Sequence, residues 1–226
     1  MPIRINGVIV SDDDLPVYTF YGIAATSPSC VRQALQDAKG EAVVVTINSG
    51  GGDVFAGSEI YTILREYPGR VLIQVQSLAA SAAAVIAMAR ESEMSPVAQL
   101  MIHNVSACTH GDCRDMAHAA EVLRNANQSI ASAFVAKSGK SETEILALMD
   151  NETWYSAQQA VADGFVDRIM DSAQTAEKPM QLAASFGSGL LPVNVIEYAK
   201  VHFNNQTAAA KAKAEYEFLI LEGKAK

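Results

Sequence analysis

Two hydrophobic patterns alternate along the first half of the chain, and together they predict an α/β fold. Continuous β-branched runs at 42–48 and 71–75 are typical of strands that are buried on both faces. Each run is followed by a stretch suited to a helix, at 54–67 and at 78–89. Strand, helix, strand and helix in this order predict βαβ units, a parallel sheet and right-handed crossovers.

Weaker patterns extend this arrangement toward both ends. Further strands are expected at 3–10, 17–23, 98–104 and just after 163–167, and further helices at 27–39, 111–137, 141–149 and 156–162. The composition shifts beyond residue 171, where prolines and a Gly-Ser-Gly run mark a linker, and an Ala/Lys/Glu-rich stretch at about 208–221 predicts one more helix. We therefore expect one α/β domain over 1–170 and a C-terminal linker and helical extension over 171–226.

Ser81 is expected at the junction between the strand at 71–75 and the Ala-rich helix that follows it. The first backbone N–H groups of a helix have no partner inside it, and they lie at the positive end of the helix dipole. A nucleophilic serine needs an exposed hydroxyl beside donors of this kind, and small flanking side chains let a substrate approach. The alternative is a tightly packed helix of small residues, in which the Ser81 hydroxyl only bonds a carbonyl.

Two further polar features follow predicted strands. Three glycines at 50–52 come directly after one buried strand, and His103 ends another short strand. Because neighbouring parallel strands present their carboxyl ends at the same edge of a sheet, we expect the glycines to lie near Ser81. Neither of the usual phosphate-binding glycine patterns is present. Each feature also has a structural alternative, a tight turn for the glycines and a carbonyl-bonded imidazole for His103.

The composition is that of a globular protein: of 226 residues, 50% are hydrophobic and 19% are charged, and the net charge is -8. The negative charge argues against a nucleic-acid partner. Cys30, Cys108 and Cys113 fit a reducing compartment better than a disulfide framework, and their spacing predicts no metal site. No signal peptide is visible, and the most apolar run is shorter than the ~20 residues of a membrane span. These features predict a cytoplasmic protein without a membrane partner.

Four short motifs occur in order along the chain. They are Asn-Ser-Gly-Gly-Gly at 48–52, Ala-Ala-Ser at 79–81, Met-Ile-His-Asn at 101–104, and Tyr-Ser-Ala with Gly-Phe-Val-Asp between 155 and 167. Together they resemble the ClpP-type serine peptidases over about residues 3–170. Within that family the chain most resembles the ClpP-like head maturation proteases of tailed bacteriophages, on its Glu-Thr-Trp-Tyr-Ser-Ala and Gly-Gly-Asp-Val-Phe-Ala-Gly segments and its C-terminal extension. The fold implied is the ClpP/crotonase-like superhelix of βα units with a mostly parallel sheet.

The resemblance implies a Ser-His-acid triad. Ser81 falls on the family's nucleophile and His103 on its general base. The third position, two residues before Trp154, holds Glu152 where the family has aspartate, and Asp150 is the alternative acid. A glutamate can hold an imidazole in one tautomer as an aspartate does, because triads are defined by geometry and role.

The resemblance also assigns the contacts to the substrate. The backbone N–H groups of Gly52 and Ala82 fall on the oxyanion-hole positions, and Gly51, Gly52 and Asp53 are expected to bind the substrate. Gly50 stands where the family usually has proline, which loosens the loop and leaves the two functional glycines intact. The reaction implied is acyl transfer, with no metal or organic cofactor.

The function implied is that of a serine endopeptidase which cleaves scaffold or capsid proteins during phage head maturation. It would act in the host cytoplasm, within the assembling procapsid. The resemblance further implies a homo-oligomeric ring, of seven subunits or a stacked pair of such rings, with ring-to-ring contacts from the helix at 111–137.

Three alternatives remain open at this point. A housekeeping ClpP-like peptidase would work with an ATPase unfoldase, through an axial N-terminal segment and hydrophobic docking pockets. A crotonase-like acyl-CoA enzyme would share the fold and a backbone oxyanion hole but would need no Ser/His pair. A structural assembly protein with a degenerate site is the non-enzymatic alternative.

Overall fold

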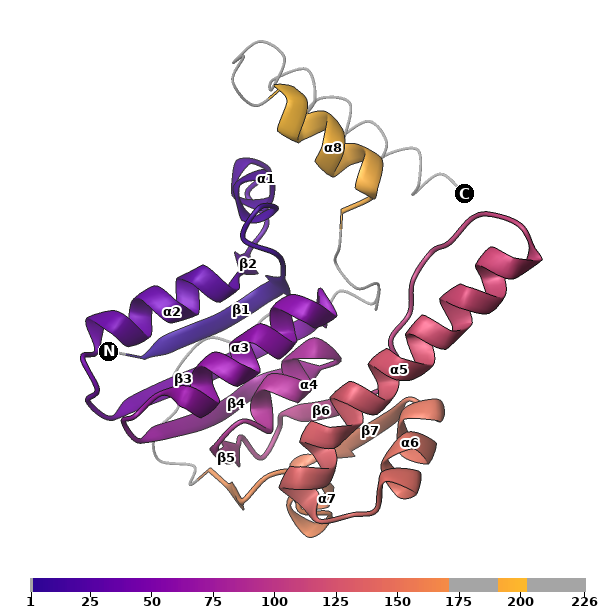
Figure 1. Cartoon of the computed structure of the whole chain (residues 1–226). Coiled ribbons are helices and arrows are strands. Elements are labelled where there is room, and N and C mark those ends of the chain that lie inside the picture. The colour runs from indigo at the N-terminus through magenta and orange to yellow at the C-terminus, as the bar shows by residue number, and fades with distance from the viewer. Residues whose placement is uncertain (1, 171–190, 203–226) are drawn as a thin grey trace.

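The computed structural model describes residues 2–170 and 191–202 (Figure 1). In this part of the chain the strands are β1 (Ile3–Ile9), β2 (Ala25–Thr26), β3 (Val43–Gly52), β4 (Val71–Ala80), β5 (Glu91–Met94), β6 (Gln99–Ile102), β7 (Thr153–Ser156) and β8 (Arg168–Ile169). The helices are α1 (Leu15–Phe20), α2 (Pro28–Asp37), α3 (Val54–Glu66), α4 (Ala82–Ala87), α5 (Cys113–Ser138), α6 (Glu142–Asp150), α7 (Ala157–Ala162) and α8 (Val193–His202). None of these helices combines the length and the apolar character that crossing a membrane requires.

The strands form one mostly parallel sheet. Six of them lie in the order β2-β1-β3-β4-β5-β8, and each pairs in parallel with its neighbours. β6 branches from β4, also in parallel, and β7 pairs with β6 in the opposite direction. Helices α2, α3 and α4 lie along one face of the sheet (Figure 1). The predicted α/β fold class with a mostly parallel sheet is therefore confirmed.

Alternate side chains of the central strands form the core. On β3, Val43, Val45 and Ile47 are buried, and the side chains between them are only partly covered. The buried set packs against α3, which contributes Ile60 and Leu64. Every residue of α4 is buried as well, so the Ala-rich run does form an internal helix.

The prediction of a strand at 17–23 is wrong. The structure has α1 there, with Pro16 in its first turn. Proline is favoured at a helix start, and this preference outweighs the strand propensity of the aromatic and β-branched residues that follow. Val17 and Tyr18 are buried in a second, smaller hydrophobic cluster that α8 completes.

The observed ends of two strands also differ from the predicted ones. β3 runs through the three glycines to Gly52, because it stays paired with β1 as far as Ile9. β4 likewise continues to Ala80, beyond the predicted start of the helix, since Ala79 pairs with residues on both β3 and β6. The short strands β5 and β7 have no counterpart in the sequence prediction, because four residues carry too little periodicity to be recognised.

The segment after Pro192, which the sequence assigns to a linker, contains α8. This helix lies beside α1 (Figure 1), and its Ala199 joins Tyr18 in the small cluster. The Tyr18 hydroxyl accepts a hydrogen bond from the Leu191 N–H at 2.7 Å. The helix predicted at 208–221 lies outside the described residues, so the division into two domains stays a prediction.

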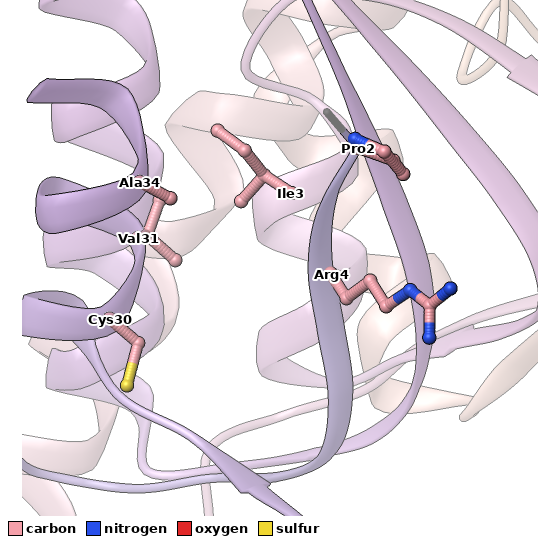
Figure 2. Close-up of a pocket in the computed structure, with 6 residues that line it drawn as sticks. All are labelled: Pro2, Ile3, Arg4, Cys30, Val31 and Ala34. Atoms are coloured by element: carbon pink, nitrogen blue, oxygen red, sulfur yellow. The ribbon is translucent and has the colours of Figure 1, made fainter. Parts of the chain in front are cut away.

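An open pocket of about 510 Å³ lies between the beginning of β1 and α2. Figure 2 shows Ile3 pointing from the strand toward Val31 and Ala34 on the helix. Ile3 lies at the opposite end of β1 from Ile9, which pairs with Gly52. The pocket is therefore roughly 20 Å along the strand from the glycines.

A cluster of charged side chains connects the segment before β8 to α5. The Asp167 carboxylate accepts hydrogen bonds from the Ser92 N–H at 2.6 Å and from the Lys137 ammonium. Lys137 also donates to the Arg90 carbonyl at 2.9 Å, and its side chain is only 10% exposed. Burial by itself would raise the pKa of Asp167, but the hydrogen bonds from Lys137 and Ser92 outweigh it and hold that pKa below its ordinary value.

We expect Asp167→Asn to lower the free energy of unfolding by about 1–3 kcal/mol at neutral pH, because it leaves a largely buried ammonium without its anion. A carboxyl whose pKa is lower in the folded state stabilises the fold above its unfolded pKa, about 4, and this contribution disappears as the pH falls through the folded pKa. Urea unfolding of both proteins should therefore show a difference that shrinks below about pH 4.

The control for this measurement is Glu59→Gln, which removes the carboxylate of the exposed pair with Arg32. Exposed pairs contribute little, so this variant should cost less than ~1 kcal/mol. Equal losses for the two variants at neutral pH would contradict the assigned role of Asp167.

Candidate active site

Ser81 lies in a strained turn between β4 and α4. Its backbone has φ 56° and ψ -124°, a conformation that costs a residue with a side chain about 1–3 kcal/mol. Hydrogen bonds hold it on both sides: the Ser81 N–H donates to the Met101 carbonyl at 3.0 Å, and the Ser81 carbonyl accepts from the Ala84 N–H at 2.9 Å. The strain is therefore maintained by β6 on one side and by the first turn of α4 on the other.

Glycines allow neighbouring segments to approach this turn closely. A Cβ atom at Gly51 would lie 2.7 Å from both the Ala80 carbonyl oxygen and the Cβ of Ser81, and Gly51 also has φ +98°. A Cβ at Gly57 on α3 would lie 2.9 Å from the Cβ of Ala82. Gly57 is not among the predicted site residues, although a glycine inside a predicted helix often signals close packing.

His103 lies at the end of β6, directly beside Ser81. The parallel pairing of β4 with β6 sets Ala80 opposite Met101, so the residues that follow each strand emerge at the same edge. The His103 Nε2 lies 2.8 Å from the Ser81 Oγ. A hydroxyl bonded to an imidazole in this way is the usual arrangement of a nucleophile and its general base.

Two backbone N–H groups near Ser81 are candidates to stabilise an oxyanion. The N–H of Ala82 belongs to the first turn of α4, where N–H groups have no partner within the helix. The N–H of Asp53 donates to the Ile9 carbonyl on β1 at 2.8 Å. Because successive N–H groups of an extended chain point to opposite sides, we expect the N–H of Gly52 to face β4 and Ser81. These two groups are the candidates for an oxyanion hole.

Two of the predicted substrate-binding groups already have partners inside the chain. The Asp53 carboxylate caps α3 by accepting a hydrogen bond from the Ala56 N–H at 2.7 Å. The Gly51 N–H donates to the Ser49 hydroxyl at 3.1 Å. The structure therefore gives the Asp53 side chain a role in starting the helix that follows the glycines.

Neither candidate acid contacts the imidazole. The Glu152 carboxylate accepts from the Trp154 indole N–H at 3.3 Å, and the Asp150 carboxylate accepts from the Asn104 side-chain amide at 2.7 Å. Within the described part of the chain, Ser81 is the one hydrogen-bond partner of the His103 ring. The ladder between β6 and β7 ends at Ile102–Thr153, and the next residue back along the chain, Glu152, lies in a turn with φ 45°.

We expect Gly51→Ala to slow the labelling of Ser81 by a fluorophosphonate at least ~100-fold, because a Cβ there displaces the turn that carries the hydroxyl. Gly50→Ala is the matched control, since a Cβ at Gly50 meets no atom within 4 Å. Mass spectrometry of the labelled proteins measures both rates. Equal labelling of the two variants would contradict the close contact between Gly51 and Ser81.

Comparison with known proteins agrees with this geometry. The sequence profile of the family described as Clp protease matches residues 30–173. The chain is 32% identical over 131 residues to the ATP-dependent Clp protease proteolytic subunit 2 of Corynebacterium diphtheriae, an alignment that covers 57% of this chain and 66% of that one. It is also 32% identical over 131 residues to proteolytic subunit 1 of Corynebacterium jeikeium, covering 57% and 70%. The matches thus span about two thirds of these relatives' length.

A solved structure shares the fold. A ClpP1 mutant from Listeria monocytogenes superposes with a TM-score of 0.63 at 20% identity, covering 76% of this chain and 92% of that chain. The family profile extends over more than half of the chain and includes the segments that carry Ser81 and His103. The chain therefore belongs to the Clp protease family, as a serine peptidase of the ClpP type.

Proposed function

We propose that this protein is an endopeptidase in which Ser81 is the nucleophile and His103 the general base. The single observation that carries the proposal is the 2.8 Å contact between the Ser81 Oγ and the His103 Nε2, at the strained turn that begins α4. A non-enzymatic assembly protein would not need to maintain that strain. An acyl-CoA enzyme would not need the Ser–His pair, and the family match gives that alternative no support.

The reaction follows from the positions of these groups. The Ser81 Oγ bonds to the carbonyl carbon of a peptide while its proton passes to the His103 Nε2. The carbonyl oxygen becomes an oxyanion, which accepts hydrogen bonds from the N–H groups of Ala82 and Gly52. The C–N bond then breaks, and the leaving amine takes the proton from His103. Water, deprotonated by His103, releases the acyl group from Ser81 in the same way.

Glu152 is the acid that we assign to the triad. Its support is its position directly before β7, at the end of the ladder where His103 follows β6, together with its exposure, which leaves the carboxylate free to turn from the Trp154 indole toward the imidazole. Asp150 is the weaker candidate, because its carboxylate is already bound to the Asn104 amide. An acid at this position would fix the tautomer of His103 and stabilise its charged form.

We expect Ser81→Ala and His103→Ala to reduce hydrolysis of an unfolded protein such as casein by ~10³–10⁶, and Glu152→Gln to reduce it less. Thr62→Ala, which alters an exposed hydroxyl on α3, is the control and should leave the rate unchanged. Time-resolved gel analysis of the fragments measures all four variants. Fragmentation that persists in Ser81→Ala would rule out the assigned nucleophile.

The names of the relatives favour an unfoldase-assisted peptidase. The two relatives described above are subunits of ATP-dependent proteases. The pocket between β1 and α2, lined in part by Ile3, Val31 and Ala34, offers an apolar surface on which a partner of this kind could dock (Figure 2). In this setting the substrates are protein chains that the partner delivers unfolded.

Head maturation is the second setting. It is favoured by the Glu-Thr-Trp-Tyr-Ser-Ala and Gly-Gly-Asp-Val-Phe-Ala-Gly segments and by the chain beyond residue 171. In both settings we propose a homo-oligomeric ring, of seven subunits or a stacked pair of rings. The first half of α5 extends beyond the sheet (Figure 1), and its Met116 and Val122 are 39% and 49% exposed, which suits a contact between rings.

The pocket separates the two settings experimentally. The assay combines the enzyme with a host ATP-dependent unfoldase, ATP and a tagged folded protein. We expect the unaltered enzyme to degrade the tagged protein. We expect Ala34→Asp to lose this degradation, because a carboxylate would make the pocket polar. Ala38→Asp, at the C-cap position directly after α2 and outside the pocket, should retain degradation. Hydrolysis of a short peptide should be equal in all three proteins. Cleavage of a co-expressed scaffold protein without ATP, and no unfoldase-dependent degradation, would favour head maturation instead.

A further inference from the structure

The segment that carries His103 has no regular structure of its own. The β6–β7 ladder ends at the pair Ile102–Thr153, and α5 does not begin until Cys113. Residues 103–112 between them belong to neither helix nor strand. The ladder therefore fixes the backbone on one side of the imidazole, and other contacts must fix it on the other side.

Two side chains from different helices supply those contacts. The Asn127 Oδ1 on α5 accepts a hydrogen bond from the Val105 N–H at 2.8 Å. The Asn104 amide donates to the Asp150 carboxylate at the end of α6, at 2.7 Å. Val105 also packs against the main core. Side chains from two different helices therefore hold the two residues after His103. Of these side chains, only Asp150 is a predicted site residue.

The Asn127 contact is the more rigidly supported of the two. Asn127 is half-buried, and over the next two turns of α5 the side chains of Ile130, Ala131 and Phe134 are buried in the main core. A side chain on an anchored helix places its oxygen with little freedom, whereas the Asn104–Asp150 bond joins a half-buried amide to an exposed carboxylate.

The position of His103 matters because its ring has so few other restraints. Its only hydrogen bond within the described residues is the one to Ser81. Proton transfer requires the ring nitrogen to stay within hydrogen-bond reach of the hydroxyl, and a displacement of about 1 Å can cost ~100-fold in rate. We infer that Asn127 is a positioning residue of the catalytic centre: by binding the Val105 N–H, it holds the His103 backbone so that the imidazole meets Ser81. This inference rests on the proposed function.

The test measures acylation of Ser81 by a fluorophosphonate, which reports the Ser–His pair without any protein substrate. Asn127→Leu keeps the side-chain size and removes the hydrogen-bond acceptor. It should lower the maximal rate constant of labelling ~10–100-fold, while the fluorophosphonate concentration that gives half of the maximal rate stays the same. Asn127→Asp keeps an acceptor oxygen and should label within about threefold of the unaltered rate. Asn125→Leu, at an exposed position on the same helix, is the matched control and should not change labelling.

Each outcome decides the question. Equal labelling of Asn127→Leu and the unaltered protein, or equal losses in Asn127→Leu and Asn127→Asp, would overturn the inference. If Asn127→Leu does not fold, as judged by its thermal transition, Asn127→Ser replaces it, since the shorter hydroxyl cannot reach Val105, and the same rate loss is expected. Failure of the unaltered protein to label at Ser81 would instead overturn the proposed function, so the two failures are distinguishable.

Discussion

The strained backbone at Ser81 is the constraint on which the rest of the site depends. A residue with a side chain combines φ 56° with ψ -124° only when its surroundings hold it in that conformation. Here β6 binds its N–H, the first turn of α4 binds its carbonyl, and Gly51 fills the space where a larger residue would push it aside. The same turn that strains the backbone also presents the hydroxyl at the carboxyl edge of the sheet, within reach of His103.

This constraint explains the unusual run of small residues nearby. α3 and α4 approach so closely that Gly57 faces Ala82 without room for another carbon, and the alanines of α4 are fully buried. Small side chains contribute little buried area, so stability has to come from elsewhere. The β-branched side chains of β3 and β4 provide it, together with the Arg90 guanidinium, which binds the carbonyls at the end of α3.

The groups of the proposed catalytic centre come from separate parts of the chain. The glycines come from β3, the serine from the turn after β4, the imidazole from the residue after β6, and the candidate acid from the turn before β7. The imidazole is the least restrained of them, because it begins an irregular segment. Contacts from α5 and α6 to that segment therefore connect the catalytic geometry to helices that carry no reacting group. The small cluster between α1 and α8 lies outside this network.

The parallel α/β architecture, the junction that carries Ser81 and the strand end that carries His103 could all be predicted from the sequence, because buried β-branched runs and helix-start signals are local and strong. The sequence did not determine α1, where proline in the first turn overrode strand propensity, nor the extension of β3 and β4 through glycine and alanine, which depends on pairing with neighbouring strands. The partners of Glu152, Asp150 and Asn127 were likewise decided only by the tertiary structure. Hydrogen bonds between side chains far apart in the chain leave no periodic signal in the sequence, and only the packing of strands and helices brings such groups within reach of one another.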